Sequence, residues 1–558
     1  MSKPPKVHPT KPNTGFQVTK PIDVPNTLPC KKLLLQHDFG STSSQTGNHS
    51  SVTINYAPPS SSHCASTNFS KIVLEWNGAC NWTQIDTVFG VWLGGVEILR
   101  SSPAQGVNTS VAWTASKDVT RYSSLLLKKE AQELVVSFRH PVSQDARVYR
   151  ITMFILFYPT DNRKNNPPNN MIDLGFGSES KADLILPISG DLKSKDGFWF
   201  QIENSTDVKL ASFEIPRNAY RAVLEVYVSA HNVDEAWYWN YPTEYYNIDH
   251  LDDEPGDGPF RDVVINLDDD RVGAIWPFPV IYDALDNIFN PVASTRSFDL
   301  PSYDFELTPF LGNLLDGGVH NFSFSIGNAI NVWYVGANLH LWLDRKSQRT
   351  KGKLVSSFDQ RLNFTSMLRM QVPLGESWIE AHRMTSSQGW VQSSYGNITT
   401  RVNQNLSYTN YMDQKLGAAT VQQLILSNDS VSFATSDDDN RYSFESAKNF
   451  SLAMKRQVRI LEGKGNAINT LDLTTGYVDK KTYKKSKSRS DFKTSTLEDQ
   501  QRGSSVWAID NYTWNAASQG LKQSYKYRSV DGNGKVCYFR KIGSANATIV
   551  HDNEGVKC

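Results

Sequence analysis

The sequence lacks any long hydrophobic run, and no uninterrupted stretch of about 18 apolar residues occurs anywhere in its 558 residues. We therefore expect no membrane-spanning helix. Nor does an apolar segment follow Met1, as it would in a secretory signal peptide. We expect either that a signal peptide has been removed or that the start of the chain is misassigned.

An excess of charge of one sign is also absent. The chain has 57 basic and 57 acidic residues and a formal net charge of zero, whereas proteins that bind nucleic acid or acidic membranes usually carry a basic excess. We therefore expect no nucleic-acid and no membrane partner. The length is sufficient for roughly two to four domains, each with its own core, and composition does not determine the oligomeric state.

The local motifs of several catalytic classes are missing. The sequence has no G-x-S-x-G, no H-E-x-x-H and no Cys/His spacing typical of zinc sites. Glu462–Asn466 (EGKGN) lacks the preceding strand and following helix that a phosphate-binding loop needs. We therefore expect no metal ion and no cofactor. With eleven histidines, a Ser/His/Asp triad assembled from distant residues stays open as an alternative.

Cysteine is scarce, with five residues in two groups near the ends of the chain. In the first group, Cys30, Cys64 and Cys80 allow three different single bridges, and one thiol is left over. In the second group we expect a Cys537–Cys558 disulfide. Such pairs are typical of proteins that pass through an oxidising compartment.

Glycosylation sequons, in contrast, are abundant. Together with paired cysteines, this density favours a secreted glycoprotein. We expect glycans at Asn81, Asn321, Asn397, Asn428 and Asn511, and further N-x-S/T triplets begin at Asn48, Asn68, Asn108, Asn204, Asn363, Asn405, Asn449 and Asn546.

Short runs rich in β-branched and aromatic residues recur from Lys32 onward, and no long helical period appears. This pattern predicts an all-β fold with two jelly-roll-like β-sandwich domains followed by a further β-rich C-terminal unit. A proline-rich start and the polar stretch TDNRKNNPPNNM mark boundaries. The predicted division is an extended arm at 1–29, a β-sandwich at 30–160, a linker at 161–180, a second β-sandwich at 181–345 and a C-terminal β-rich domain at 346–558.

Beyond Lys346 the sequence is rich in Ser, Thr and Asn and its alternation weakens, so we expect the third unit to be looser than the sandwiches. Within it, Lys480–Lys493 (KKTYKKSKSRSDFK) is basic and poorly hydrophobic. That composition predicts an exposed, protease-sensitive loop rather than a binding site.

A first candidate catalytic group lies in a strongly β-like stretch. If Ile85–Leu93 is extended, Asp86 shares a face with Val88 and Trp92. A carboxylate among apolar neighbours is a candidate catalytic residue, and Trp92 is a candidate substrate-binding residue. Alternatively, Asp86 ends a strand in water or accepts a hydrogen bond from a backbone amide.

A second candidate segment is HNVDEAWYWNYPTEYY (231–246), where adjacent carboxylates are followed by aromatic residues. Tryptophan and tyrosine have flat apolar faces that stack on sugar rings, and paired carboxylates can act as acid and base. Repulsion between Asp234 and Glu235 would make one of them hold its proton longer. The alternative is that the aromatics cover the end of a sandwich and the acids are solvated. Candidate sugar-binding residues are Asp234, Trp237, Tyr238 and Trp239, with Arg261 as a polar support.

Long collinear segments spanning nearly the whole chain carry a resemblance to a known family. They include GVWLGGVEILR (90–100), KDVTRYSSLLLK (117–128), IPRNAYRAVLEVYVS (215–229), the aromatic segment above, SFDLPSYDFELTPFLGNLLDG (297–317) and NVWYVGANLHLWLD (331–344). These segments closely resemble the plant peptide:N-glycanase A family. The resemblance extends from FQVTKPIDVP (16–25) to CYFR (537–540) and is weakest between Val402 and Gly532.

The resemblance implies hydrolysis of the amide that joins an N-glycan to asparagine in peptides and proteins, leaving aspartate and a glycosylamine that then loses ammonia. It also implies a secretory or vacuolar, metal-independent enzyme that works at mildly acidic pH. Two motifs are similar to bacterial glycoamidases, at Cys80–Asp86 and Asp234–Trp237. They imply that Asp86 is the principal catalytic carboxylate and Glu235 its partner. Thr87 stands where the bacterial motif and many plant relatives have arginine, so a cation that would hold Asp86 ionised is missing.

The same residues are compatible with two alternatives. A carbohydrate-binding or inactive glycoamidase-like protein would leave a glycopeptide intact. A glycoside hydrolase using the same acids would leave one sugar on asparagine, whereas the amidase leaves none.

Overall fold

The computed structural model is nearly all β, with five sheets and a few short helices. No helix in its described part is long and apolar enough to cross a membrane. The structure describes residues 13–40, 49–59, 64, 68–80, 87–104, 110–139, 148–160, 181–191, 197–245, 256–281, 288–371, 374–415, 420–436, 441–461, 466–485, 492–510, 513–532 and 534–557.

Residues of the first predicted sandwich form two largely antiparallel sheets, ordered β1–β7–β4–β9–β2 and β3–β8–β5–β6. Aromatic side chains fill the space between them: Trp76 contacts Phe89 edge-on, and Phe138 stacks on Phe39 and on Phe89. The elements are β1 (Asn13–Gly15), β2 (Cys30–Gly40), β3 (His49–Tyr56), β4 (Phe69–Cys80), β5 (Val88–Leu93), β6 (Val96–Ser101), β7 (Val111–Asp118), η2 (Thr120–Tyr122), α1 (Ser123–Leu126), β8 (Gln132–Arg139) and β9 (Val148–Pro159).

A second pair of sheets follows, ordered β10–β18–β13–β16, with β11 also paired to β18, and β12–β17–β14–β15. Every position of β13 is buried, because its sheet is covered on both faces. The elements are β10 (Leu184–Ile188), β11 (Phe200–Ile202), β12 (Val208–Phe213), β13 (Ala219–Ala230), η4 (Asn232–Asp234), η5 (Trp237–Trp239), η6 (Thr243–Tyr245), β14 (Asp262–Leu267), β15 (Asp270–Ile275), β16 (Ser302–Glu306), η7 (Thr308–Phe310), α3 (Leu311–Leu314), β17 (His320–Gly327) and β18 (Trp333–Leu343).

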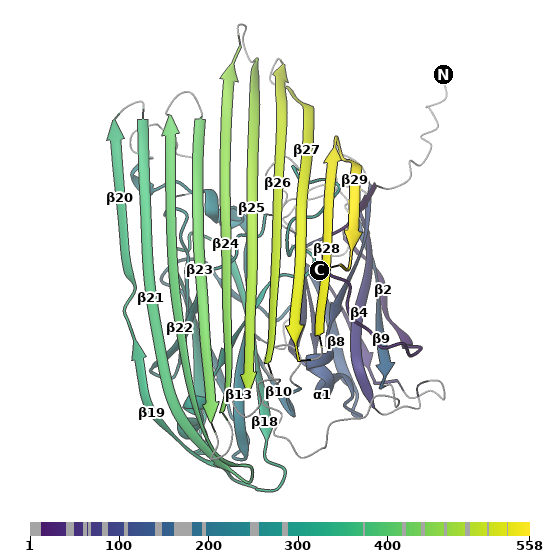
Figure 1. Cartoon of the computed structure of the whole chain (residues 1–558), viewed down its shortest axis with the longest axis vertical. Coiled ribbons are helices and arrows are strands. Elements are labelled where there is room, and N and C mark those ends of the chain that lie inside the picture. The colour runs from purple at the N-terminus through teal and green to yellow at the C-terminus, as the bar shows by residue number, and fades with distance from the viewer. Residues whose placement is uncertain are drawn as a thin grey trace.

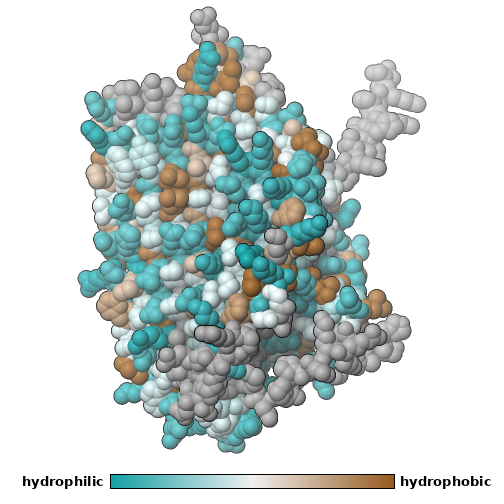
Figure 2. Space-filling model, in the orientation of Figure 1, coloured by the Kyte–Doolittle hydropathy of each residue, from teal (hydrophilic) through white to brown (hydrophobic). Residues whose placement is uncertain are grey.

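The C-terminal residues form one 11-stranded antiparallel sheet with strands of up to 20 residues. In Figure 1 this sheet lies in front of both sandwiches, and Figure 2 shows that its outward face is mostly hydrophilic. Its strands are β19 (Lys351–Asp359), β20 (Asn363–Gln371), β21 (Leu374–Ser393), β22 (Gly396–Lys415), β23 (Thr420–Ser436), β24 (Arg441–Ile460), β25 (Ala467–Lys485), β26 (Phe492–Asp510), β27 (Thr513–Asp531), β28 (Gly534–Ala545) and β29 (Thr548–Gly555).

Two expectations for this region were wrong. The third unit is not looser than the sandwiches, because each central strand is hydrogen-bonded along its length on both sides. Nor is the basic run all loop: Lys480–Lys485 pairs with β24, and Phe492 and Lys493 begin β26. Residues 486–491 of that run lie outside the described residues.

The N-terminal arm joins the units rather than extending away from them. β1 pairs in parallel with β7, and Val18 is buried. Further along, Arg540 of β28 lies over the ring of Phe16 and Lys20 lies over Tyr527 of β27. The arm therefore contacts both the first sandwich and the C-terminal sheet.

The structure selects one of the three amino-terminal cysteine pairings. Cys30 is bonded to Cys64, with Cα atoms 5.6 Å apart, and Cys80 is buried in β4. The predicted Cys537–Cys558 bond includes Cys558, which lies outside the described residues. Glycosylation stays a prediction: Asn321, Asn397 and Asn428 are exposed, and Asn81 and Asn511 are outside the described part.

Candidate active site

The aromatic segment forms a compact series of turns at the end of β13. His231 is still extended, its amide donates to the carbonyl of Val332, and Asn232 then adopts a positive φ of 59°. Asparagine tolerates this conformation better than most residues. The chain turns here into η4 and η5, so Asp234 and Glu235 are held on consecutive positions of one rigid turn.

Asp234 is the centre of a buried hydrogen-bond network. Its carboxylate accepts from Arg261 Nη2 at 2.6 Å, from Trp333 Nε1 at 2.7 Å and from the Ile330 amide at 2.9 Å. Asn240 Nδ2 donates to it as well, at 3.2 Å. Asp234 and Arg261 both have 0% exposed side chains. Their buried position therefore does not support the expectation that they bind sugar. Instead, both side chains stabilise the turn from the protein interior.

Glu235 directly follows Asp234 in this turn, at the C-terminal end of η4. It is 7% exposed, and its amide donates to the carbonyl of Asn232 at 3.1 Å. Burial, and after it the charge of Glu235, raise the pKa of Tyr238. Both adjacent carboxylates are buried, and Glu235 keeps the small exposed surface that Asp234 lacks.

The three candidate aromatics differ in accessibility. Trp237 and Tyr238 are buried, and Trp237 packs against Tyr238 and Trp333. Trp239 is half-buried. It packs against a small cluster that includes Met412 of the C-terminal sheet. Among the three, Trp239 is the residue with ring surface left to contact a sugar.

Trp92 lies inside the protein. It is fully buried, and its ring meets Trp199 edge-on at 4.8 Å. Trp199 stacks on Tyr334 at 5.1 Å, and Tyr334 packs against His231 at 4.7 Å. Trp92 is therefore connected to the base of the turn through other rings, and its described position leaves no face for substrate.

The sequence reading missed a buried ion pair beneath this aromatic stack. Arg100 donates to both oxygens of Glu97, at 2.7 and 2.8 Å, and to the Tyr334 carbonyl at 2.7 Å. In a regular strand these two positions would face opposite sides. A bulge between β5 and β6 leaves Ile98 unpaired and brings both charges to one side. Two charged residues within the apolar run VEILR were the available signal.

Asp86 lies outside the described residues. β5 begins at Val88, two positions later, and Thr87 is buried with its hydroxyl 3.2 Å from that of Tyr149. Among the residues that the structure does describe, no group of three or more His, Cys, Asp or Glu side chains is placed to hold a metal ion.

Comparison with known proteins places these features in a family. The family model described as peptide N-acetyl-beta-D-glucosaminyl asparaginase amidase A matches residues 16–360, and the PNGase_A C-terminal domain model matches residues 378–452. Peptide-N4-(N-acetyl-beta-glucosaminyl)asparagine amidase A of Prunus dulcis is 43% identical over 561 residues, covering 100% of this chain and 95% of that protein.

Solved structures with local similarity include PNGase F of Flavobacterium meningosepticum, described as a glycosylasparaginase. It has a TM-score of 0.36 and 14% identity, over 57% of this chain and 96% of that chain. PNGF-II has a TM-score of 0.37 and 11% identity, over 56% of this chain and 66% of that chain. The family match over more than half of the residues and the full-length identity to the Prunus dulcis protein show that this chain belongs to the peptide N-acetyl-β-D-glucosaminyl asparaginase amidase A family.

Proposed function

We propose that the protein is a peptide:N-glycanase that hydrolyses the amide between an N-glycan and asparagine in glycopeptides and glycoproteins. The observation that carries this is the 43% identity to the Prunus dulcis amidase A over the whole chain. Water supplies oxygen to the asparagine carbonyl carbon, and the carbon–nitrogen bond breaks. The products are aspartate and a glycosylamine, and no redox partner is needed.

Within this proposal Glu235 and Asp86 are the catalytic carboxylates. Glu235 orients or deprotonates the attacking water, and Asp86 engages the scissile amide. Asp234 and Arg261 act as positioning residues, because their buried pair holds the turn that carries Glu235. Trp239 contacts the sugar next to the amide, with Trp237 and Tyr238 supporting it from the interior. The proposed setting is the secretory pathway or vacuole, in keeping with the sequon density.

The reaction is tested with one defined glycopeptide incubated in ¹⁸O-labelled water and examined by mass spectrometry. The amidase leaves aspartate carrying one heavy oxygen and releases a glycan with both core sugars. A sugar retained on asparagine would identify a glycoside hydrolase instead. An unchanged glycopeptide that nevertheless binds would identify a carbohydrate-binding protein, and either result overturns the proposal.

The role of Glu235 is tested by Glu235→Gln, which keeps the size of the side chain and removes its basicity. We expect kcat to fall by roughly 100-fold or more, since general acid–base groups contribute about that much. Glu244→Gln is the matched control, because Glu244 is an exposed glutamate of the same segment. Equal activity of both variants would remove Glu235 from the mechanism.

A further inference from the structure

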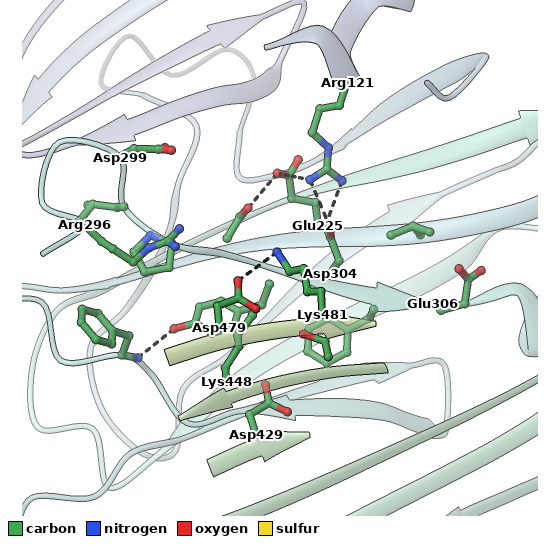
Figure 3. A pocket seen from close by; sticks show the side chains of 18 of the residues that line it. Arg121, Glu225, Arg296, Asp299, Asp304, Glu306, Asp429, Lys448, Asp479 and Lys481 are labelled. Carbon is green, nitrogen blue, oxygen red and sulfur yellow. Dashed lines mark hydrogen bonds and ion pairs between the residues drawn. The ribbon is translucent and has the colours of Figure 1, made fainter. Parts of the chain in front are cut away.

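A separate cavity lies between the two sandwiches and the C-terminal sheet (Figure 3). Its volume is about 390 Å³, within the range of roughly 300–1,000 Å³ usual for small-molecule sites. Glu225 of β13 lines it. Along an extended strand Glu225 precedes Ala230 by about 16 Å, so the cavity is distinct from the turn that carries Glu235.

The cavity has two walls of different origin. Its floor is the buried Glu225, with 0% side-chain exposure, whereas Asp299, at 41%, and Lys481, at 47%, lie at its solvent-exposed rim. A dissolved molecule can therefore reach it. As Figure 3 shows, the sandwich wall contributes Arg121, Glu225, Arg296, Asp299, Asp304 and Glu306, and β23, β24 and β25 contribute Asp429, Lys448, Asp479 and Lys481.

The charges that line the cavity largely cancel. Acidic and basic side chains are nearly equal in number, and several are paired with a neighbour on the same wall. Arg121 Nη2 lies 3.0 Å from Asp304 Oδ1, and Lys481 Nζ lies 3.0 Å from Asp479 Oδ2. A phosphorylated or otherwise strongly anionic ligand would meet as many carboxylates as cations, so a neutral ligand fits this electrostatic environment better.

Several buried polar atoms of the lining have no hydrogen-bond partner within the described part of the chain. They are Oδ1 of Asp479, Nε of Arg296 and Nε1 of Trp342. Leaving one such atom unsatisfied costs roughly 1–3 kcal/mol. Because the set contains both acceptors and donors, it matches a ligand whose groups do both, as sugar hydroxyls do.

Aromatic rings form another part of the lining. The rings of Phe278 and Tyr477 meet edge-on, with centroids 5.3 Å apart. Lys448 Nζ lies over the ring of Tyr303, 5.2 Å from its centroid. Flat apolar surface beside polar atoms is the combination that recognises a pyranose, because one face of the ring is apolar and its edge carries hydroxyls.

We propose that this cavity is a second saccharide-binding site, which takes one or two neutral hexose or N-acetylhexosamine units. The hydroxyls of the bound saccharide donate hydrogen bonds to Asp429 and Asp479, and its apolar face contacts the aromatic rings. The proposal does not require Glu235 to be catalytic. If the protein is an N-glycanase, this site would hold a part of the glycan remote from the amide.

The test is saturation-transfer NMR on the full-length protein with mannose, N-acetylglucosamine and chitobiose, and with inorganic phosphate as competitor. Ser446→Trp fills the cavity, because Ser446 lines it from β24. Glu445→Trp is the matched control: the adjacent residue of a strand faces the opposite side, and Glu445 is exposed. We expect at least about a tenfold loss of saccharide affinity in Ser446→Trp and none in Glu445→Trp.

Asp479→Asn, which adds no bulk, should weaken binding by roughly three- to tenfold. Trp239→Ala, in the other site, should leave this component unchanged. The proposal is overturned if the wild type binds no saccharide, if binding survives Ser446→Trp, or if phosphate displaces the sugar. Hydrolysis of a glycopeptide with only the two core sugars, measured in parallel, should persist in Ser446→Trp; its failure in the wild type would instead count against the proposed function.

Discussion

Asp499 of β26 is a buried carboxyl that should make stability depend on pH. It is 4% exposed. Its Oδ2 accepts from Thr295 Oγ1 at 2.8 Å and its Oδ1 from Gln523 Nε2 at 2.7 Å. Burial raises the pKa of Asp499 from 3.8 to about 6, although these two hydrogen bonds and Arg296 act in the opposite direction. The residue therefore changes charge in the mildly acidic range.

The size and sign of the effect follow from proton linkage. Raising the pKa from 3.8 to about 6 corresponds to about 3 kcal/mol between the two protonation states. The folded protein holds this proton more tightly than the unfolded chain, so stability falls as pH rises from about 4 to about 6. Above that window the full penalty of burying the charged Asp499 is present.

Asp499→Asn removes the penalty and should therefore raise the melting temperature at pH 7 and leave it nearly unchanged at pH 4. The melting temperature of Asp499→Asn is compared with that of the wild type by thermal unfolding at pH 7 and at pH 4. Glu498→Gln is the control, because Glu498 neighbours Asp499 on the opposite, exposed face of β26 and its pair with Lys526 is long, at 3.8 Å. A melting temperature of Asp499→Asn that falls equally at both pH values would refute the reasoning.

Three further predictions concern the interior. Asp234→Asn should lower stability by roughly 3–5 kcal/mol, because it leaves a buried guanidinium unpaired; a double variant that also replaces that arginine by methionine should recover part of the loss in a thermal-unfolding cycle. Burial alone would raise the pKa of Glu225, but the arginine and histidine beside it hold it well below the usual range. Glu225→Gln should thus cost most at neutral pH, and the cost should shrink as pH falls below about 4, as melting temperatures would report. In Gly389→Ala the new Cβ would lie 2.1 Å from the carbonyl oxygen of Pro309, whereas in Gly543→Ala its nearest neighbour is at 3.7 Å; only the former should destabilise, by about 1–3 kcal/mol.

The strands of the sandwiches were largely predictable because their inward faces are apolar. Leu33–His37, Glu133–Phe138, Arg221–Ser229 and His320–Ile326 all lie within observed strands. The C-terminal unit was correctly predicted to be β-rich, but the length and regularity of its strands were not predicted, because many of their inward residues are polar. Gln404, for example, is buried with both amide atoms bonded to the backbone of Ala274. Such satisfied polar positions do not produce a hydrophobic period.

The candidate turn was visible in the sequence because carboxylates and aromatics are consecutive in it. Which of them reach the surface was not, since this depends on partners far along the chain. Asp234 is made interior by Arg261, Ile330 and Trp333. Similarly, Glu97 and Arg100 meet only because of a bulge that alternation cannot predict. Sequence pattern thus identified the segment, and tertiary contacts determine which of its residues are fully buried.

The C-terminal sheet is part of the candidate site's support. Gln423 Nε2 of β23 donates to the Tyr238 carbonyl at 2.7 Å, and Arg383 Nη2 of β21 donates to Asp262, next to Arg261, at 2.6 Å. Asp499 contacts the second sandwich from the same sheet through Thr295. Acid therefore favours both the docking of the sheet and the protonated form of any carboxylate in the site. Asp499→Asn tests the contribution of this one contact, because it removes the titration of Asp499 and leaves the carboxylates of the site unchanged. If activity is highest at acidic pH and the optimum broadens toward neutral pH in this variant, docking through Asp499 contributes to it; an optimum that does not move excludes that contribution.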